Sequence, residues 1–196
     1  AFATPLLEAL ERRPDENLLA SVTTIVSSGA SMSSETREGL IRHQSDLLLL
    51  DTLGSTESSG YALSTPEAGV FAPLPHTRVL DEQLQDVPPG SDTIGMIYGG
   101  GYQPIGYYNA PEKSAETFVT IEGQRYVMTG DRCTVRDDGN LVLLGRDSTV
   151  VNTGGEKVYT VEVERVLTDF PAITDALVVG LPHPRFGKMV VAVVQG

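Results

Sequence analysis

Residues Leu47–Glu57 read Leu-Leu-Leu-Leu-Asp-Thr-Leu-Gly-Ser-Thr-Glu, a compact apolar run with a polar ending. The run predicts a buried strand, and Gly54 marks the expected turn of the chain. Because ligands bind at the carboxyl ends of strands in open parallel sheets, Thr56 and Glu57 are expected at a binding edge. A hydroxyl beside a carboxylate suits a Mg²⁺ ion that also holds phosphate oxygens. Taken alone, the same residues are more typical of a capped turn.

The residues upstream of this run alternate between strand and helix patterns. A β-branched run at Val22–Val26 predicts a short strand, and Ser33–His43 predicts a helix with Ser34 as its cap and Glu35 in its first turn. Asp46–Leu50 is the next predicted strand. A strand, a helix and a strand in this order indicate a mostly parallel, buried sheet over residues 1–74.

Short strands separated by turn residues dominate the middle of the chain. The strand candidates are Thr77–Leu80, Gly95–Tyr98, Arg125–Thr129 and Leu141–Leu144. Residues 75–146 are therefore predicted to form an antiparallel, barrel-like β unit. Residues 147–196 form a third predicted part, with a helix that Thr160 caps and that runs to about Phe170, and with strands at Ala176–Val179 and Met189–Val194.

The composition limits the classes of partner. The 196 residues carry a net charge of −12, which argues against nucleic acids, because proteins that bind a phosphate backbone carry basic patches. The single cysteine, Cys133, allows no intrachain disulfide, so a cytoplasmic location is expected. No apolar run is long enough to span a bilayer.

The chain begins without Met and stops directly after an apolar run, so both ends are expected to be cuts within a longer sequence. The sequence indicates no oligomeric state.

Three polar segments downstream have both a functional and a structural interpretation. Asp131 ends the triplet Thr129-Gly-Asp131, and a carboxylate there can accept hydrogen bonds from two vicinal hydroxyls of a ribose, or simply close a tight turn. Arg146 is suited to a ribose or phosphate, or to a surface ion pair. The pair Gly154-Gly155 permits close approach of a ligand, or forms a hairpin loop.

Five motifs in a fixed order favour the functional interpretations. They are Leu53–Glu57, Gly106–Phe118, Tyr126–Asp131, Gly145-Arg146 through Thr153–Lys157, and Val161–Glu164. In this order they resemble the adenylate-forming superfamily, which includes acyl-CoA synthetases, luciferases and adenylation domains of peptide synthetases. Ser27–Ser31 is similar to its loop beside adenine and the acyl group. Asn152–Val158, and Phe71–Pro75 before Thr77–Leu80, are most similar to fatty-acid and steroid-side-chain CoA ligases.

The resemblance implies both a fold and a reaction. The fold is α/β plus β: the end of a large N-terminal α/β domain, a small antiparallel β-barrel-like subdomain, and the start of an α+β C-terminal domain. The reaction uses ATP, Mg²⁺ and CoA. A fatty or steroid carboxylate attacks the α-phosphate of ATP, which yields an acyl adenylate and pyrophosphate. After rotation of the C-terminal domain, the CoA thiol attacks the adenylate and releases AMP.

The resemblance also implies roles for individual residues. Glu57 is the Mg²⁺ ligand and Thr56 contacts phosphate, so these two are the expected catalytic residues. Asp131 holds the ribose hydroxyls, and Arg146 contacts ribose and phosphate. The remaining nucleotide-binding residues are Ser28, Gly29, Ala30, Gly54 and Ser55. A loop that meets the pantetheine arm of CoA contains Gly154, Gly155 and Glu156, and the hinge contains Asp147 and Ser148.

The chain departs from the family pattern in several places. Ser148 stands where the family usually has Asp or Lys at the hinge, and Met128 stands where many members have Arg. The family's phosphate loop and its adenylation Lys are absent from these 196 residues, so the chain by itself is expected to be inactive. Two other functions stay open: an acyl-AMP ligase that loads a carrier protein, and a non-catalytic nucleotide-binding or interaction module.

Overall fold

The computed structural model describes residues 2–29, 32–67 and 69–196. Its helices are α1 (Ala3–Glu11), α2 (Ser34–His43), α3 (Pro111–Thr117) and α4 (Thr160–Thr168), and a short 3₁₀ turn, η1, covers Asp147–Thr149. The strands are β1 (Thr24–Ser28), β2 (Leu48–Ser55), β3 (Ser58–Ser64), β4 (Val70–Pro73), β5 (Thr77–Leu80), β6 (Gly95–Gly99), β7 (Phe118–Ile121), β8 (Gln124–Val135), β9 (Leu141–Arg146), β10 (Val151–Thr153), β11 (Glu156–Val158), β12 (Asp175–His183) and β13 (Gly187–Gln195). The chain is thus a mixed α/β structure with few helices, as the sequence predicted in outline.

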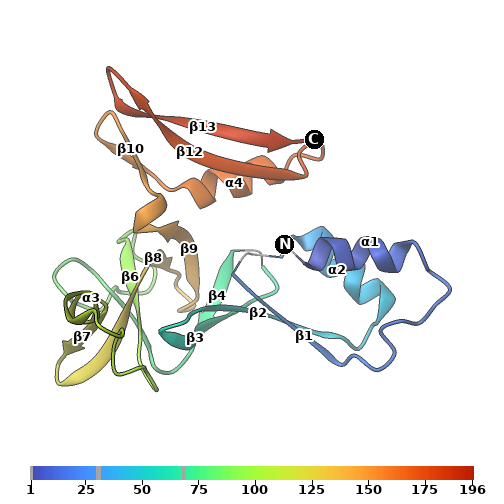
Figure 1. Ribbon diagram of the computed structural model, residues 1–196, viewed down its shortest axis with the longest axis horizontal. Helices are drawn as coiled ribbons and strands as arrows, with labels where there is room; N and C mark the ends of the chain where they lie inside the picture. Colours follow the sequence, from blue (N-terminus) through green and yellow to red (C-terminus); the bar gives the residue numbers. More distant parts are fainter. Residues whose placement is uncertain (1, 30–31, 68) are drawn as a thin grey trace.

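The expected parallel strand pair lies at one end of the main sheet. β1 and β2 run parallel, from Thr24 opposite Leu48 to Ser28 opposite Thr52. Helices α1 and α2 pack beside this pair (Figure 1). The apolar residues that they bury together are Leu7, Leu10, Leu19, Met32, Leu40, Leu47 and Leu49. This core holds the carboxyl ends of β1 and β2 side by side, where the sequence predicted a binding edge.

The cap of α2 differs from the sequence prediction. Ser33 has the extended backbone of a capping residue, and its Oγ accepts a hydrogen bond from Thr36 N at 3.2 Å. Ser34 was expected in this role but is already the first helical residue, so that prediction is wrong by one position. The physical reason is that the capping oxygen must reach the N–H three residues ahead from a non-helical backbone.

Nine strands of the described residues form one long sheet. Its order is β1-β2-β3-β4-β9-β8-β6-β5, with β7 paired to β8. The sheet continues from the first predicted part into the second, because β4 pairs with β9. Beyond β2 the pairs are antiparallel, and one core contains side chains from β3, β4, β5, β6, β8 and β9. The path of the described strands is open, so the structure does not confirm a closed barrel.

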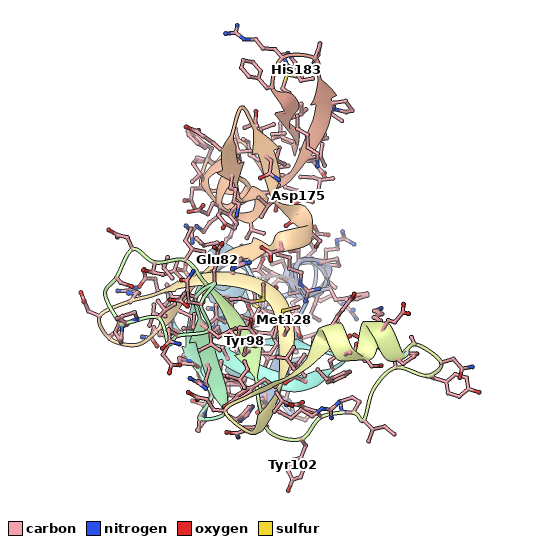
Figure 2. The ribbon with its side chains drawn as sticks, turned by 90° about the vertical axis from the view of Figure 1, so that its left-hand side faces the viewer. Glu82, Tyr98, Tyr102, Met128, Asp175 and His183 are labelled. Atoms are coloured by element: carbon pink, nitrogen blue, oxygen red, sulfur yellow. The ribbon has the colours of Figure 1, made fainter. Side chains whose placement is uncertain are left out.

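The last part of the chain forms two small antiparallel sheets. β10 pairs with β11, and β12 pairs with β13 along their full lengths. Helix α4 packs against β12, where Glu164 Oε1 accepts a hydrogen bond from Val178 N at 2.7 Å. Figure 1 shows the β12–β13 hairpin above the main sheet. In Figure 2, His183 lies at the tip of this hairpin, and the exposed Tyr102 lies at the opposite end of the molecule. Among the described helices, none has the length and apolar character needed to cross a membrane.

Candidate functional site

Glu57 lies in the tight turn between β2 and β3. The Tyr107 hydroxyl, from the loop before α3, donates a hydrogen bond to Glu57 Oε1. This hydrogen bond lowers the pKa of Glu57, because it stabilises the ionised carboxylate, while partial burial opposes the shift. The same contact raises the pKa of Tyr107, whose neutral hydroxyl is the donor. Glu57 is therefore an anion at neutral pH, with one of its oxygens engaged by the protein.

Three neighbours hold Tyr107 in this position. Its backbone N donates a hydrogen bond to Ser114 Oγ at 2.8 Å, and its ring centroid lies 5.7 Å from that of Phe118. Lys113 Nζ lies 4.4 Å from the Tyr107 ring centroid, within the range of a cation–π contact. Two motifs that lie 50 residues apart in sequence therefore meet at one carboxylate. The sequence showed both motifs but not their contact.

Asp131 is almost completely buried, with 3% of its surface exposed. Arg146 Nε donates a hydrogen bond to Asp131 Oδ1 at 2.9 Å, from the facing position on β9. The Tyr61 hydroxyl donates a hydrogen bond to Asp131 Oδ2. Hydrogen bonding to Asp131 raises the pKa of Arg146, and burial raises the pKa of Tyr61. The structure thus brings together Asp131 and Arg146, which the sequence had singled out separately.

The end of β2 carries three further predicted residues. Gly54 lies within β2 and the chain turns only after Ser55, so the turn expected at Gly54 is displaced. A Cβ at Gly54 would lie 3.1 Å from Gly60 Cα, a tight contact, so glycine eases the close approach of β2 and β3. The Ser55 hydroxyl is buried, and its proximity contributes to the lowered pKa of Glu57. Thr56 is exposed in the turn.

The loop after β1 contains the other predicted nucleotide residues. Ser28 Oγ donates a hydrogen bond to Thr52 O at 3.1 Å, which joins the end of β1 to the middle of β2. Gly29 follows with a φ of 89°, a conformation that favours glycine. Ala30 lies outside the described residues. The buried Asp51, which the sequence did not single out, accepts a hydrogen bond from Met32 N at 3.2 Å and anchors the far end of this loop to β2.

The predicted hinge, Asp147 and Ser148, lies in η1 between β9 and β10. Arg132 donates two hydrogen bonds to Asp147, from Nε to Oδ1 at 2.8 Å and from Nη2 to Oδ2 at 2.9 Å. Because Arg132 lies on β8, this ion pair ties η1 to the main sheet. The sequence did not indicate this ion pair, because the register of β8 and β9 shifts at Arg132 and Cys133 and such a shift cannot be seen in a sequence.

Gly154 and Gly155 form the two-residue turn between β10 and β11. Both have positive φ, 59° and 96°, as a tight hairpin turn requires. The hairpin interpretation that the sequence left open is therefore confirmed. Gly154 N donates a hydrogen bond to Phe186 O at 3.1 Å, so this turn rests on the turn between β12 and β13. Glu156 is exposed at the start of β11.

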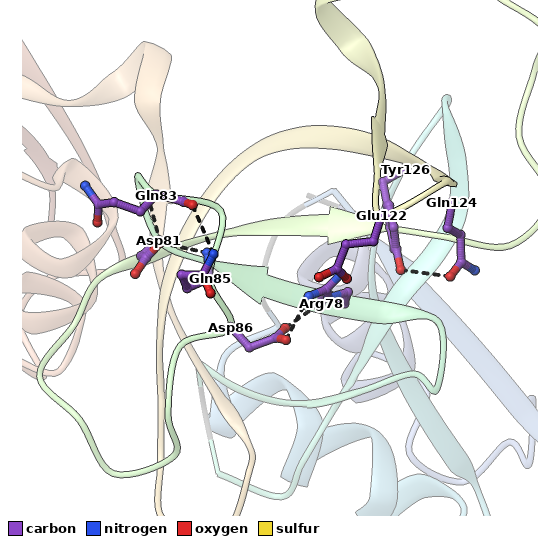
Figure 3. A network of polar contacts seen from close by, with 8 residues as sticks. All are labelled: Arg78, Asp81, Gln83, Gln85, Asp86, Glu122, Gln124 and Tyr126. Atoms are coloured by element: carbon purple, nitrogen blue, oxygen red, sulfur yellow. Dashed lines mark hydrogen bonds and ion pairs between the residues drawn. The ribbon is translucent and has the colours of Figure 1, made fainter.

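A separate polar cluster lies at the β5 edge of the main sheet (Figure 3). Arg78 donates hydrogen bonds to Asp86 at 3.0 and 2.8 Å and to Glu122 at 2.8 Å, and none of the predicted site residues takes part. A surface hollow of about 310 Å³, lined by Gly90, Ser91 and residues 134–138, also excludes them. Within the described ranges, no group of three or more acidic, His or Cys side chains could hold a metal ion by itself. The candidate site therefore consists of Glu57 with Tyr107, and Asp131 with Tyr61 and Arg146.

Comparison with known proteins gives relatives along the whole chain. No family model matches. The medium/long-chain-fatty-acid–CoA/3-oxocholest-4-en-26-oate–CoA ligase of Mycobacterium tuberculosis is 41% identical over 202 residues, which cover 100% of this chain and 37% of the relative. The 3-oxocholest-4-en-26-oate–CoA ligase of Rhodococcus rhodochrous is 37% identical over 207 residues, which cover 99% of this chain and 37% of the relative. The chain thus spans little more than a third of these curated relatives.

Solved structures show the same fold. ATP-bound MatB from Rhodopseudomonas palustris matches with a TM-score of 0.72 and 26% identity, over 98% of this chain and 42% of that chain. The amide bond synthetase McbA from Marinactinospora thermotolerans matches with a TM-score of 0.75 and 26% identity, over 98% of this chain and 44% of that chain. The resemblance carried by the ordered motifs is therefore confirmed. Along its whole length, the chain is homologous to one part of the fatty-acid and steroid CoA ligases of the adenylate-forming superfamily.

Proposed function

We propose that the chain is part of an ATP-dependent ligase that joins a fatty acid or a steroid-side-chain acid to CoA. The names of the curated relatives that match the whole chain support this proposal. The acid carboxylate would attack the α-phosphate of ATP to give an acyl adenylate and pyrophosphate, and the CoA thiol would then release AMP. Because the chain spans 37% of those relatives, the activity is proposed for a longer protein, and the chain alone would be inactive.

The single observation that carries the proposal is the buried Asp131 held by Arg146. Each carboxylate oxygen has two lone pairs and accepts one hydrogen bond here, so each keeps one lone pair that a ribose hydroxyl would use in this proposal. The Arg146 side chain is 52% exposed, which leaves its permanently charged guanidinium accessible to a phosphate. In this proposal Ser28, Gly29, Ala30, Gly54, Ser55 and Thr56 complete the nucleotide site at the ends of β1 and β2.

Glu57 fits the role of a Mg²⁺ ligand shared with phosphate. Magnesium is usually held by one or two carboxylates together with phosphate oxygens and water. Glu57 offers one ionised carboxylate, and the buried Ser55 hydroxyl two positions earlier helps to lower its pKa. A bound Mg²⁺ would neutralise charge on the phosphates, which is the main source of catalysis in such transfers. The Tyr107 hydroxyl would keep the carboxylate ionised and oriented, and Thr56 would contact phosphate.

The C-terminal elements would serve the second half of the reaction. The turn Gly154-Gly155 and the exposed Glu156 are proposed to meet the pantetheine arm of CoA, since two glycines permit close backbone approach. Asp147 and Ser148 are proposed as the hinge, because η1 joins the main sheet to the C-terminal sheets. The barrel-like closure of residues 75–146, the domain bounds 1–74, 75–146 and 147–196, and the cytoplasmic location stay predictions.

Calorimetry of the purified chain with AMP tests the nucleotide site. Binding is expected for the unaltered chain, and Asp131→Asn should weaken it strongly, since the ribose hydroxyls lose an ionised acceptor. Asp86→Asn, in the separate Arg78 cluster, is the matched control and should leave binding unchanged. Absence of AMP binding by the unaltered chain would contradict the proposal and favour an interaction module. Carboxylate-dependent exchange between ATP and pyrophosphate by the chain would contradict its predicted inactivity.

One observation favours a second function, in which the acyl adenylate reacts with an acceptor other than CoA. The likeness to an amide bond synthetase is as strong as the likeness to MatB, so the same fold occurs in an enzyme whose name implies an amide product. An acyl-AMP ligase that loads a carrier protein would likewise share the first step and differ in the second. Supplying the longer protein with acid, ATP and CoA, and measuring thioester formation, separates these functions. Adenylate formation without thioester would favour the second candidate.

A further inference from the structure

Tyr61 connects the middle of β3 to the Asp131 carboxylate. The two residues are 70 positions apart in sequence, and the Tyr61 hydroxyl donates a hydrogen bond to Asp131 Oδ2. Tyr61 is fully buried, with 0% of its surface exposed, and lies in the core that β3, β4, β5, β6, β8 and β9 share. A buried hydroxyl needs a hydrogen-bond partner, and here the partner is a residue of the proposed nucleotide site.

The position of Tyr61 is rigidly determined by its surroundings. Its backbone carbonyl accepts hydrogen bonds from Leu74 N at 2.9 Å and from Thr77 Oγ1 at 2.6 Å. Its ring lies in a cluster that includes Val79, Ile97 and Cys133, each with at most 8% of its surface exposed. Because both the backbone and the ring are held, the hydroxyl has little freedom to follow a moving carboxylate. The carboxylate must instead adopt the orientation that the hydroxyl sets.

Asp131 is therefore held from both sides. Arg146 Nε contacts Oδ1 and the Tyr61 hydroxyl contacts Oδ2, so rotation of the carboxylate about its terminal bond would break both hydrogen bonds. The Arg146 side chain is half exposed and can move, whereas Tyr61 is fully enclosed. Of the two donors, Tyr61 therefore sets the orientation of the Asp131 carboxylate and the direction of its free lone pairs.

We propose that Tyr61 is a positioning residue that orients Asp131 toward the two hydroxyls of a bound ribose. This inference rests on the proposed nucleotide site and adds to it a residue from a third strand. Without the Tyr61 hydroxyl, Asp131 keeps its Arg146 partner but loses its fixed orientation. Selectivity for a ribose over a sugar without vicinal hydroxyls should fall, while contacts to the base and phosphate stay unchanged.

Calorimetry of the full chain with AMP and with 2′,3′-dideoxy-AMP separates this role from a purely structural one. Tyr61→Phe should weaken AMP binding about tenfold, the scale of one hydrogen bond to a charged group, and leave dideoxy-AMP binding unchanged. Tyr126→Phe is the matched control, because Tyr126 is also buried but its hydroxyl donates a hydrogen bond to Gln124 at 3.1 Å (Figure 3) and not to Asp131. It should change neither affinity.

Each outcome is decisive. An equal loss for both nucleotides in Tyr61→Phe, or no loss of AMP affinity, would overturn the inference while the nucleotide site stands. No AMP binding by the unaltered chain would overturn both the site and the inference. If Tyr61→Phe does not fold, ¹³Cζ-labelled tyrosine in the unaltered chain answers the same question, with signals assigned by replacing the other tyrosines singly. The Tyr61 signal should shift with AMP and not with dideoxy-AMP; an unchanged signal would refute the role.

Discussion

Replacing Arg146 with methionine should destabilise the chain by removing the charged partner of a buried carboxylate. Methionine keeps an unbranched side chain on β9 but removes Nε, which donates to Asp131 Oδ1 at 2.9 Å. Asp131 then keeps the Tyr61 hydroxyl as its only side-chain donor among the described residues. A buried charge that loses its partner is strongly unfavourable, because its lost hydration is no longer compensated.

The exposure of the two partners sets the magnitude. Breaking a fully buried ion pair costs about 3–5 kcal/mol, whereas an exposed pair contributes about 0–1 kcal/mol. Here the Asp131 side chain is 4% exposed and the Arg146 side chain is 52% exposed, so solvent screens the pair from one side. We therefore expect Arg146→Met to lower the free energy of unfolding by about 2 kcal/mol, a fall in Tm of about 4–8 °C.

Urea denaturation at neutral pH, arranged as a double-mutant cycle, measures this effect. In the Asp131→Asn background, Arg146→Met should cost less, because a neutral amide needs no charged partner, and the coupling should exceed about 0.5 kcal/mol. Arg136→Met, which breaks an exposed pair with Glu67, is the control and should have a smaller effect. Equal losses for the two arginine variants, or zero coupling with Asp131, would refute the reasoning.

Three further predictions concern other parts of the chain. Tyr107→Phe should raise the pKa of Glu57 toward its ordinary value of 4.5. Because a lowered carboxyl pKa stabilises the fold above the unfolded-state pKa, this variant should be less stable at neutral pH. The difference in stability should vanish as the pH falls below 4.5, and urea midpoints measured across this pH range test it. Ser33→Ala should cost about 1 kcal/mol through loss of the α2 cap, and Ser34→Ala less; the reverse order in urea denaturation would contradict the cap. Arg132→Gln should speed amide hydrogen exchange in Asp147–Thr149 with little loss of stability, because Asp147 is 47% exposed; unchanged exchange would show that the ion pair does not restrain η1.

Much of the local structure could be predicted from patterns within a few residues. The apolar run at Leu47–Leu50 contains the first three residues of β2, and the two predicted C-terminal strands are β12 and β13. The helix predicted after Thr160 is α4, although Tyr159 and not Thr160 takes the cap position. The errors are local as well: the cap of α2 is Ser33, and the turn comes after Ser55 instead of at Gly54. Such one- or two-residue shifts arise because the exact end of an element depends on hydrogen bonds and strand contacts that a pattern does not specify.

The sequence by itself singled out three residues of the candidate site, because the order of the motifs is a linear property. Glu57, Asp131 and Arg146 could be named without any structure. Only the tertiary structure decided what holds them: Tyr107 on Glu57, Tyr61 and Arg146 on Asp131, and Arg132 on Asp147. These contacts follow from the order and register of strands distant in sequence, which the burial of a shared core selects. No local pattern records that choice, so the same carboxylates look like turn residues in the sequence and like oriented ligands in the fold.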